Sequence, residues 1–231
     1  MLLEVLCEDK SSVPVLNHIL QKILQNYQFV NQIHIYPHRG KGKLPDNIKE
    51  KPKSSTSSLL DLLPAKIRAY DKSYKDEEII FIVVLDLDDQ NLSELYKSIE
   101  YVFRSESPNK YFVIGICIEE MEAWLLGDKE ALLSAYPNAN QNVLNQYQQD
   151  GIGHTWEILA EVILDQKADN LIEAGYPAVG IYKYHWAEKI APYMQIHHNK
   201  SPSFQDFVKR MCQVLNWVEE KRQNVKIAEK S

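Results

Sequence analysis

The first half of the chain alternates short apolar runs with longer segments in which apolar residues recur every three or four positions. The short runs are rich in β-branched residues, as buried strands are, whereas the longer segments have the period of amphipathic helices. Strands are predicted at residues 2–7, 32–37, 78–85 and 111–118, and helices at residues 13–24, 59–70 and 92–103. Nearly continuous apolar strands separated by helices predict an α/β fold with a parallel four-stranded sheet flanked by helices.

The second half of the chain has a helical pattern without further strands. Helices are predicted at residues 119–136, 155–174, 182–194 and 202–222, with a polar link over residues 138–153. Ser12 and Ser201 are expected to be N-caps, the latter followed by Pro202 in the first turn. We therefore predict two parts, an α/β domain at 1–137 and a C-terminal helical lobe or extension at 138–231.

Composition narrows the function classes. The chain of 231 residues has a formal net charge of -6, so its overall field repels a nucleic acid, and a phosphate polymer must be held locally by metal or by basic residues. The three cysteines are widely spaced, which favours reduced thiols over a disulfide framework. The sequence begins without a signal-peptide pattern and contains no apolar run of membrane-spanning length, so a cytoplasmic protein without membrane contact is expected.

An acidic cluster follows the most apolar strand. Asp86, Asp88 and Asp89 come directly after residues 78–85. Because side chains alternate along a strand, Asp86 and Asp88 are expected to project to one side and to converge just beyond the strand. Hard oxygen ligands of this kind select Mg²⁺, with Mn²⁺ as a substitute. The alternative is that these are ordinary turn and cap residues.

Other charged residues follow the neighbouring strands. Ligand sites of parallel sheets lie beyond the carboxyl ends of the strands, and all the notable polar groups fall there. Glu8 follows the first strand and is either a general base or second metal ligand, or a partner of a helix dipole. Glu119, Glu120 and Glu122 follow the fourth strand, where Glu119 or Glu122 could complete a metal shell, although acidic residues also favour helix starts for electrostatic reasons alone.

Basic residues and aromatic residues supply further candidates. Arg39, Lys41 and Lys43 after the second strand, with Lys10 after the first, could bind phosphate, or the lysines could be solvated surface residues. Five aromatic residues could stack on bases, although aromatic residues at helical spacing more often belong to a core. They are Tyr182, Tyr184, Trp186, Tyr193 and Trp217.

These motifs resemble the Toprim fold of topoisomerases, DnaG-type primases and OLD-type nucleases. That family has a glutamate after its first strand and Asp-x-Asp after its third, matched here by Glu8 and by Asp86-Leu-Asp88. More closely, the chain is similar to a bacterial family of stand-alone Toprim-like proteins that is a domain of unknown function. The segments that carry this second resemblance are Arg39-Gly-Lys-Gly-Lys-Leu-Pro, Glu119-Glu-Met-Glu-Ala-Trp-Leu-Leu, Trp186-Ala-Glu-Lys-Ile-Ala-Pro and Asn199-Lys-Ser-Pro-Ser-Phe.

The resemblance implies Mg²⁺-dependent cleavage at phosphodiesters of DNA or RNA, with relatives linked to mobile-element or phage defence. The chain departs from the Toprim pattern at Asp9, where the family has glycine. It also departs at Ser12 and Gln90, because the family often has acidic residues at these two positions. These departures weaken the expectation of a second metal ion more than the expectation of the first. Two alternatives remain open, a catalytically silent binding or regulatory protein with a protein partner and, below it, a metal-dependent phosphatase.

Overall fold

The computed structural model describes residues 1–151, 153–176 and 178–228 and contains a parallel sheet of four strands. The strands are β1 (Leu2–Cys7), β2 (Gln32–Pro37), β3 (Ile79–Asp86) and β4 (Tyr111–Cys117), in the spatial order β2-β1-β3-β4. The strands pair in register, so that Cys7 lies beside Val84 and Asp86 lies beside Cys117. The predicted α/β class with a flanked parallel sheet is confirmed.

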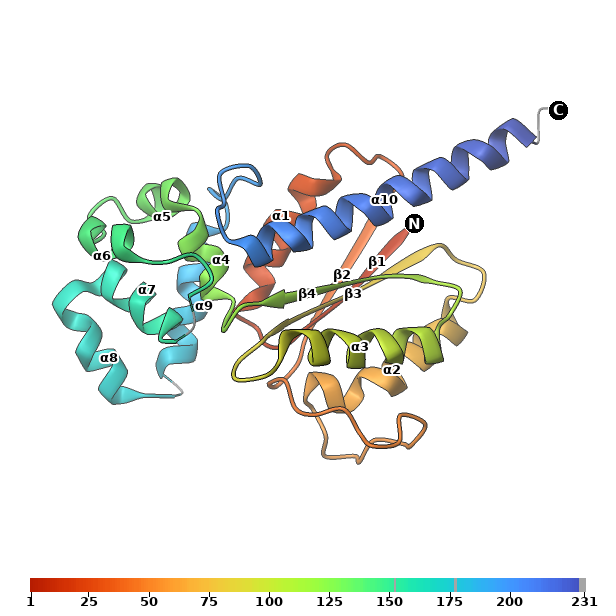
Figure 1. The fold of residues 1–231 in the computed structure, drawn as a ribbon, viewed down its shortest axis with the longest axis horizontal. Helices are drawn as coiled ribbons and strands as arrows, with labels where there is room; N and C mark the ends of the chain where they lie inside the picture. Colours follow the sequence, from red (N-terminus) through yellow and green to blue (C-terminus); the bar gives the residue numbers. More distant parts are fainter. Residues whose placement is uncertain (152, 177, 229–231) are drawn as a thin grey trace.

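Two layers of helices cover the sheet, one on each face (Figure 1). Helices α1 (Ser12–Leu24) and α10 (Pro202–Ala228) lie on one face, and α2 (Leu59–Ser73) and α3 (Leu92–Glu106) lie on the other. Strand β3 is apolar and buried on both faces until Asp86, because it lies at the centre of this sandwich. This burial explains why its sequence is nearly continuous in apolar residues rather than alternating.

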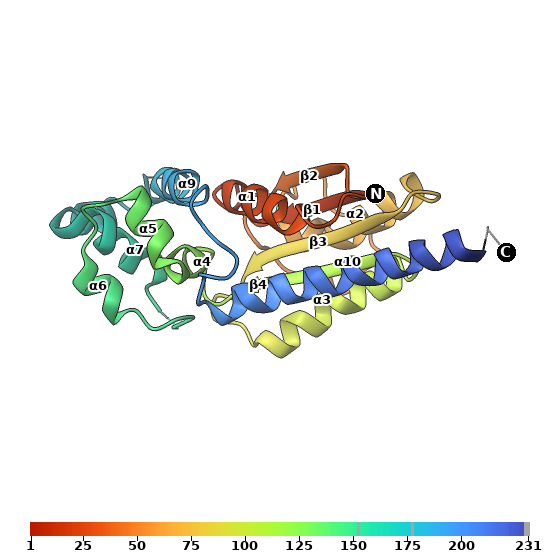
Figure 2. The ribbon, with the colours of Figure 1, turned by 90° about the horizontal axis from the view of Figure 1, so that it is seen from above.

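Helix α10 returns to the sheet after the helical lobe and packs along β4 (Figure 2). A side chain at Gly115 would place its Cβ 2.8 Å from the ring of Phe207, so the glycine allows the helix to approach the strand closely. The helix was predicted to end at Arg222 but continues to Ala228. The predicted domain boundary near residue 137 stays a prediction, although the last helix shares the core of the sheet.

The remaining helices form a lobe beyond the carboxyl ends of the strands (Figure 1). Its elements are α4 (Glu122–Gly127), α5 (Lys129–Ala135), α6 (Gln141–Gln146), α7 (Thr155–Leu164), the 3₁₀ turn η1 (Asp165–Lys167), α8 (Ala168–Ala174) and α9 (Ala178–Ile190). The helix predicted at 119–136 is two helices, because the side chain of Asp128 accepts a hydrogen bond from the Ala131 N–H (3.0 Å) and starts a new one. The helix predicted at 155–174 is likewise divided at Asp165, whose φ is 51°.

The segment that begins at Asn199 ties the lobe to the sheet. The buried Asn199 side chain donates to the Trp124 carbonyl (2.7 Å) and accepts from the Ser201 N–H (3.0 Å). The Lys200 N–H donates to the Gly127 carbonyl (2.8 Å), so the segment that leaves the lobe is bonded to the first helix of the lobe. We call these five residues the neck.

The end of the same segment starts α10. The Ser201 hydroxyl accepts from the Phe204 N–H (3.2 Å), which confirms Ser201 as an N-cap. Asp150 accepts from the Ser201 hydroxyl and from the Ser203 N–H, both at 2.6 Å. The segment 199–204, one of the segments that carry the family resemblance, therefore caps the start of α10.

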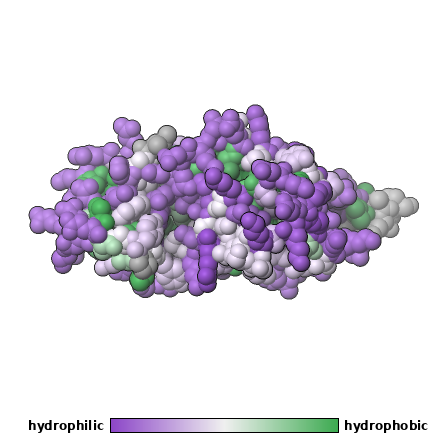
Figure 3. Space-filling view, turned by 90° about the horizontal axis from the view of Figure 1, so that it is seen from below, coloured by the Kyte–Doolittle hydropathy of each residue, from purple (hydrophilic) through white to green (hydrophobic). Residues whose placement is uncertain are grey.

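The surface and the cysteines add two observations. None of the described helices is long and apolar enough to cross a membrane. The face of the molecule drawn in Figure 3 is covered mainly by hydrophilic side chains, with apolar ones in small patches. Cys7, Cys117 and Cys212 are free thiols, as the sequence predicts.

Candidate metal centre

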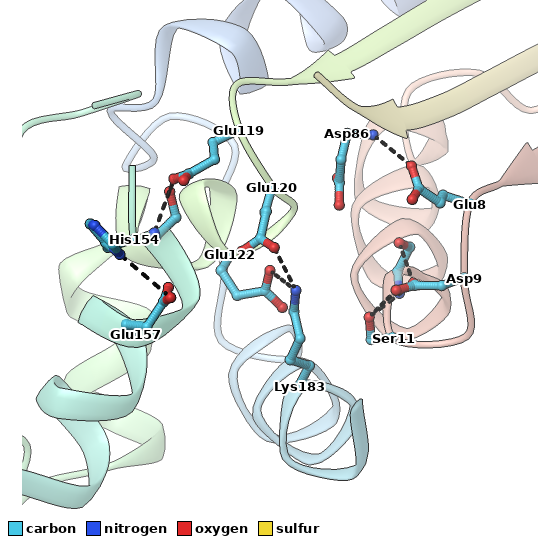
Figure 4. Close-up of polar contacts among 12 residues, drawn as sticks. Glu8, Asp9, Ser11, Asp86, Glu119, Glu120, Glu122, His154, Glu157 and Lys183 are labelled. Atoms are coloured by element: carbon cyan, nitrogen blue, oxygen red, sulfur yellow. Dashed lines mark hydrogen bonds and ion pairs between the residues drawn. The ribbon is translucent and has the colours of Figure 1, made fainter. Parts of the chain in front are cut away.

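The loops after β1, β3 and β4 meet beyond the carboxyl edge of the sheet. Glu8 directly follows β1, and Asp86 is the last residue of the neighbouring β3. The Glu8 carboxylate accepts a hydrogen bond from the Asp86 N–H at 3.2 Å, and Figure 4 shows both carboxylates on the same side of the strand ends. The sheet therefore brings together two acidic residues that are far apart in the sequence.

Glu122 brings a third carboxylate to this edge. It lies at the start of α4, is 1% exposed and pairs with Lys183 of α9 (3.0 Å). The same ammonium group pairs with Glu120 (3.2 Å), and Lys183 is itself 5% exposed (Figure 4). The lobe thus supplies a buried cation to the carboxylates that follow the sheet.

The negative charge at this edge exceeds what Lys183 neutralises. Burial, then Glu8 and Glu122, raise the pKa of Asp86 well above its ordinary value. Burial is also the main cause that raises the pKa of Glu8, and it raises the pKa of Glu120 to about 7 although Lys183 opposes the shift. Although burial lowers it, the attraction of Glu122 and Glu120 raises the pKa of Lys183 above its ordinary value. The carboxylates therefore favour either a proton or an additional cation.

Two loop residues at this edge have left-handed backbone conformations. The φ angles of Asp88 and Glu119 are 48° and 61°, and the Asp88 N–H donates to the Glu119 carbonyl (3.2 Å). Such conformations are uncommon outside glycine and cost about 1 kcal/mol or more each. Backbone strain of this kind concentrates at functional sites, so two strained acidic residues after adjacent strands add weight to this location.

Asp88 does not point at the same partner as Asp86. The strand alternation expected for the two residues stops because β3 ends at Asp86 and Asp88 turns into the left-handed region. Its carboxylate, half exposed, forms an ion pair with Lys41, which also donates to the carbonyls of Asp86 and Leu87 (3.1 Å each). Lys41 thus fastens the loop after β2 to the end of β3, and Asp88 stays a predicted metal ligand.

Glu119 is used within the lobe. Its carboxylate accepts from the N–H (3.0 Å) and from the hydroxyl of Thr155, the first residue of α7. Figure 4 shows it turned toward His154 and Glu157, away from Asp86. In this arrangement the Glu119 carboxylate accepts a hydrogen bond from a backbone N–H in the first turn of α7, which has no partner within the helix.

The other predicted site residues lie at the surface. They are Lys10, Arg39, Lys43 and Asp89, and all four are exposed. Lys10 lies near the candidate centre, because it lines a cavity together with Asp9 and Lys183. The side chains of Arg39 and Lys43 make no hydrogen bond or ion pair within the described part of the chain, and their role in phosphate binding stays a prediction.

Sequence reasoning missed Lys183 and misassigned one cap. Val179, Lys183, Trp186 and Ile190 all face the core of the lobe, so a lysine occupies one position of an otherwise apolar helical series. That irregularity was the available signal. Ser12 is not the cap of α1, because Asp9 accepts hydrogen bonds from the Ser12 N–H (3.0 Å) and hydroxyl (2.9 Å) and performs that role.

The donor set fits a hard divalent cation in part. Mg²⁺ is commonly held by one or two carboxylates, with water and substrate phosphate completing the shell, and Glu8 with Asp86 provides such a pair beside a surplus of negative charge. Within the described residues, no three His, Cys, Asp or Glu side chains surround one point as ligands. A third protein ligand would require a carboxylate such as Asp88 to leave its present partner.

Comparison with known proteins identifies a family and nothing more specific. Residues 7–212 match the family model described as Domain of unknown function (DUF4276). Searches of the curated proteins and of the solved structures gave no significant match. The resemblance to Toprim proteins and OLD-type nucleases therefore stays a prediction.

Proposed function

Because the chain belongs to the DUF4276 family, whose description assigns no activity, we propose from the candidate metal centre that the protein cleaves phosphodiester bonds of nucleic acid with the help of a divalent cation. One observation carries the proposal. Glu8 and Asp86 follow adjacent strands and adjoin at the carboxyl edge of the sheet, in a region with more buried carboxylates than buried cations. The match of Glu8 and Asp86-Leu-Asp88 to the Toprim pattern is consistent with it.

Each group has a proposed role. Glu8 and Asp86 would hold Mg²⁺, which when bound would stabilise negative charge on the phosphate. If Asp86 held the cation without it, Glu8, whose pKa burial raises, would instead be the general base that accepts a proton from an attacking water. Lys41 or Arg39 would neutralise the phosphate, and Asp88 would be freed for the cation if Lys41 moved to the substrate.

The test uses isosteric changes that leave the fold intact. Single- and double-stranded DNA and RNA are incubated with the wild-type protein and with the Glu8→Gln and Asp86→Asn variants, in Mg²⁺ or Mn²⁺. We expect each variant to lose activity by about a hundredfold or more. The matched control is the Asp76→Asn, Glu77→Gln double variant, which changes two exposed carboxylates before β3, at the opposite edge of the sheet.

A stability measurement accompanies the activity assay. In the absence of divalent cations, Asp86→Asn should stabilise the protein by about 1 kcal/mol, because it removes the cost of burying a carboxylate and the repulsion from Glu8 and Glu122. Cleavage that survives both substitutions, or no cleavage by the wild-type protein under any of these conditions, would refute the proposed function.

A binding or regulatory protein without catalysis is the second candidate. It is favoured by the two lysines, because Lys41 pairs with Asp88 and Lys183 pairs with Glu120 and Glu122, so both already act as internal cations. Calorimetric titration with Mn²⁺ separates the two candidates. The catalytic proposal requires saturable binding that Asp86→Asn abolishes, whereas the silent alternative requires none.

A further inference from the structure

A cavity of about 400 Å³ opens beside the candidate metal centre, between the loop after β1 and helix α9. We call it the aromatic pocket, and it is lined by Asp9, Lys10, Ser11, Tyr176, Gly180, Ile181, Lys183, Tyr184 and His185. It adjoins the centre because Lys183, the partner of Glu122, forms part of its wall. Figure 4 shows Lys183 rising from α9 and Asp9 with Ser11 on the neighbouring loop.

Large side chains with apolar faces are exposed around this pocket. Tyr176 is 66% exposed, Ile181 is 58% exposed and Tyr184 is 36% exposed, whereas Trp186 on the same helix is buried. Trp186 of α9 therefore builds the core, whereas Tyr184 of α9 and Tyr176, which precedes the helix, face solvent at the pocket. Exposed aromatic rings near a charged centre are a surface for stacking with a flat ligand.

Gly180 leaves room on the helix between these residues. A Cβ added at this position would meet no atom of the described residues within 4 Å, so this turn of the helix presents backbone without a side chain to the pocket. Glycine is less favourable than alanine in a helix, by up to about 1 kcal/mol in its interior, and no close packing among the described residues requires it here. The open space beside Gly180 would accommodate a ligand that lies flat against the helix.

The charges around the pocket select the kind of ligand. Lys10 supplies an exposed ammonium group at its wall, Lys183 is already paired with Glu120 and Glu122, and the centre next to it is acidic. A ligand that places a flat ring in the pocket and an anionic group toward the cation-holding carboxylates fits both parts. A nucleotide with a free base has this form, and a base within a duplex does not, because both of its faces are stacked.

We propose that the aromatic pocket holds one unpaired base of a single-stranded nucleic acid, so that the adjoining phosphate lies at the candidate metal centre. This inference rests on the proposed function for the identity of the substrate and deepens it by selecting single strands over duplexes. The base stacks on Tyr176 or Tyr184 and lies over Gly180, and Lys10 contacts the phosphate backbone at the pocket mouth.

The test measures binding apart from cleavage. Fluorescence anisotropy compares a short labelled oligothymidylate, an oligouridylate, an abasic strand with the same number of phosphates and a duplex, in EDTA and in Ca²⁺. We expect the strands with bases to bind about tenfold more tightly than the abasic strand, because stacking depends on the base and not on the phosphate. The duplex should bind no better than the abasic strand.

Variants locate the effect in the pocket. Gly180→Leu fills open space and should remove the preference for bases while keeping or raising the melting temperature. The Tyr176→Leu, Tyr184→Leu double variant should reduce the preference by at least threefold. The matched control is Tyr101→Leu, because Tyr101 is 61% exposed on α3, outside the pocket.

Two results would overturn the inference: equal affinity for the abasic and base-containing strands, including no binding by either, or an unchanged preference in a folded Gly180→Leu protein. The failure of the proposed function looks different. In that case the wild-type protein keeps its base-dependent binding and its sensitivity to Gly180→Leu but does not cleave the strand in Mg²⁺ or Mn²⁺.

Discussion

Replacing Lys183 with methionine tests the electrostatic balance at the edge of the sheet. The methionine keeps most of the side-chain volume but removes the ammonium group that pairs with Glu122 and Glu120. Glu122 is 1% exposed and would be left as a buried carboxylate without its cation. We therefore expect a large loss of stability from this single change on the buried side of α9.

The magnitude follows from the burial of the three groups. Removal of one partner of a buried ion pair costs about 3 to 5 kcal/mol. Glu120 reduces the figure, because its pKa of about 7 allows it to take up a proton near neutral pH. We expect Lys183→Met to lower the free energy of unfolding by about 3 kcal/mol at pH 8 and by less at pH 5, where protonation relieves the unpaired carboxylates.

Urea unfolding followed by circular dichroism measures this loss. The control is Lys189→Met on the same helix, where the ammonium lies over the exposed side of the Tyr136 ring (4.4 Å), and it should cost less than about 1 kcal/mol. Adding Glu122→Gln to Lys183→Met should restore about half of the loss, because the second change removes the unpaired charge.

The same variant reports on the metal. If a divalent cation binds beside Glu8 and Asp86, Mn²⁺ should stabilise Lys183→Met more than it stabilises the wild-type protein, because the cation replaces missing positive charge. A loss no larger than that of Lys189→Met, or no recovery in the double variant, would refute the reasoning about the charge balance.

Further predictions concern the same edge and the neck. Glu120 binds its proton more tightly in the folded chain, so the free energy of unfolding should fall as the pH rises from about 4.5 to about 7, by at most about 3 kcal/mol, and Glu120→Gln should flatten this part of the pH profile measured by urea unfolding. Asn199→Ala should cost about 3 kcal/mol in the same assay, because it leaves a buried carbonyl and a buried N–H unpaired, and a loss below about 1 kcal/mol would contradict this role. Gly127→Ala should lower the melting temperature, because the added Cβ would overlap the Asn199 side chain, whereas Gly180→Ala, which meets open space, should not.

Local sequence patterns predicted the elements of the sheet well. The run of β-branched residues before Asp86 is long enough to identify β3, and the alternation of strands with helices fixes a parallel arrangement. Because all strands of such a sheet end at one edge, Glu8 and Asp86 could be placed together before the structure was known.

The features that sequence reasoning missed depend on contacts between distant segments. The packing of α9 against α4 brings Lys183 to Glu122, and no pattern within either segment of the sequence predicts that ion pair. Likewise, the left-handed turn at Asp88 follows from its bond to the Glu119 carbonyl and its pairing with Lys41, which a strand-alternation rule does not include. The break at Asp128 was a local signal, since aspartate is a favoured N-cap residue.

The neck has a consequence for how relatives of this protein can diverge. The carbonyl of Gly127 contacts the N–H of Lys200, so the polypeptide departs from the α/β layer and comes back within one hydrogen bond. A lobe attached in this manner can be exchanged for a larger or smaller one without moving a strand, provided that both ends stay side by side. Because the lobe also supplies Lys183 and Glu122, such an exchange would change the charges beside the carboxylates while Glu8 and Asp86 keep their places at the ends of the strands.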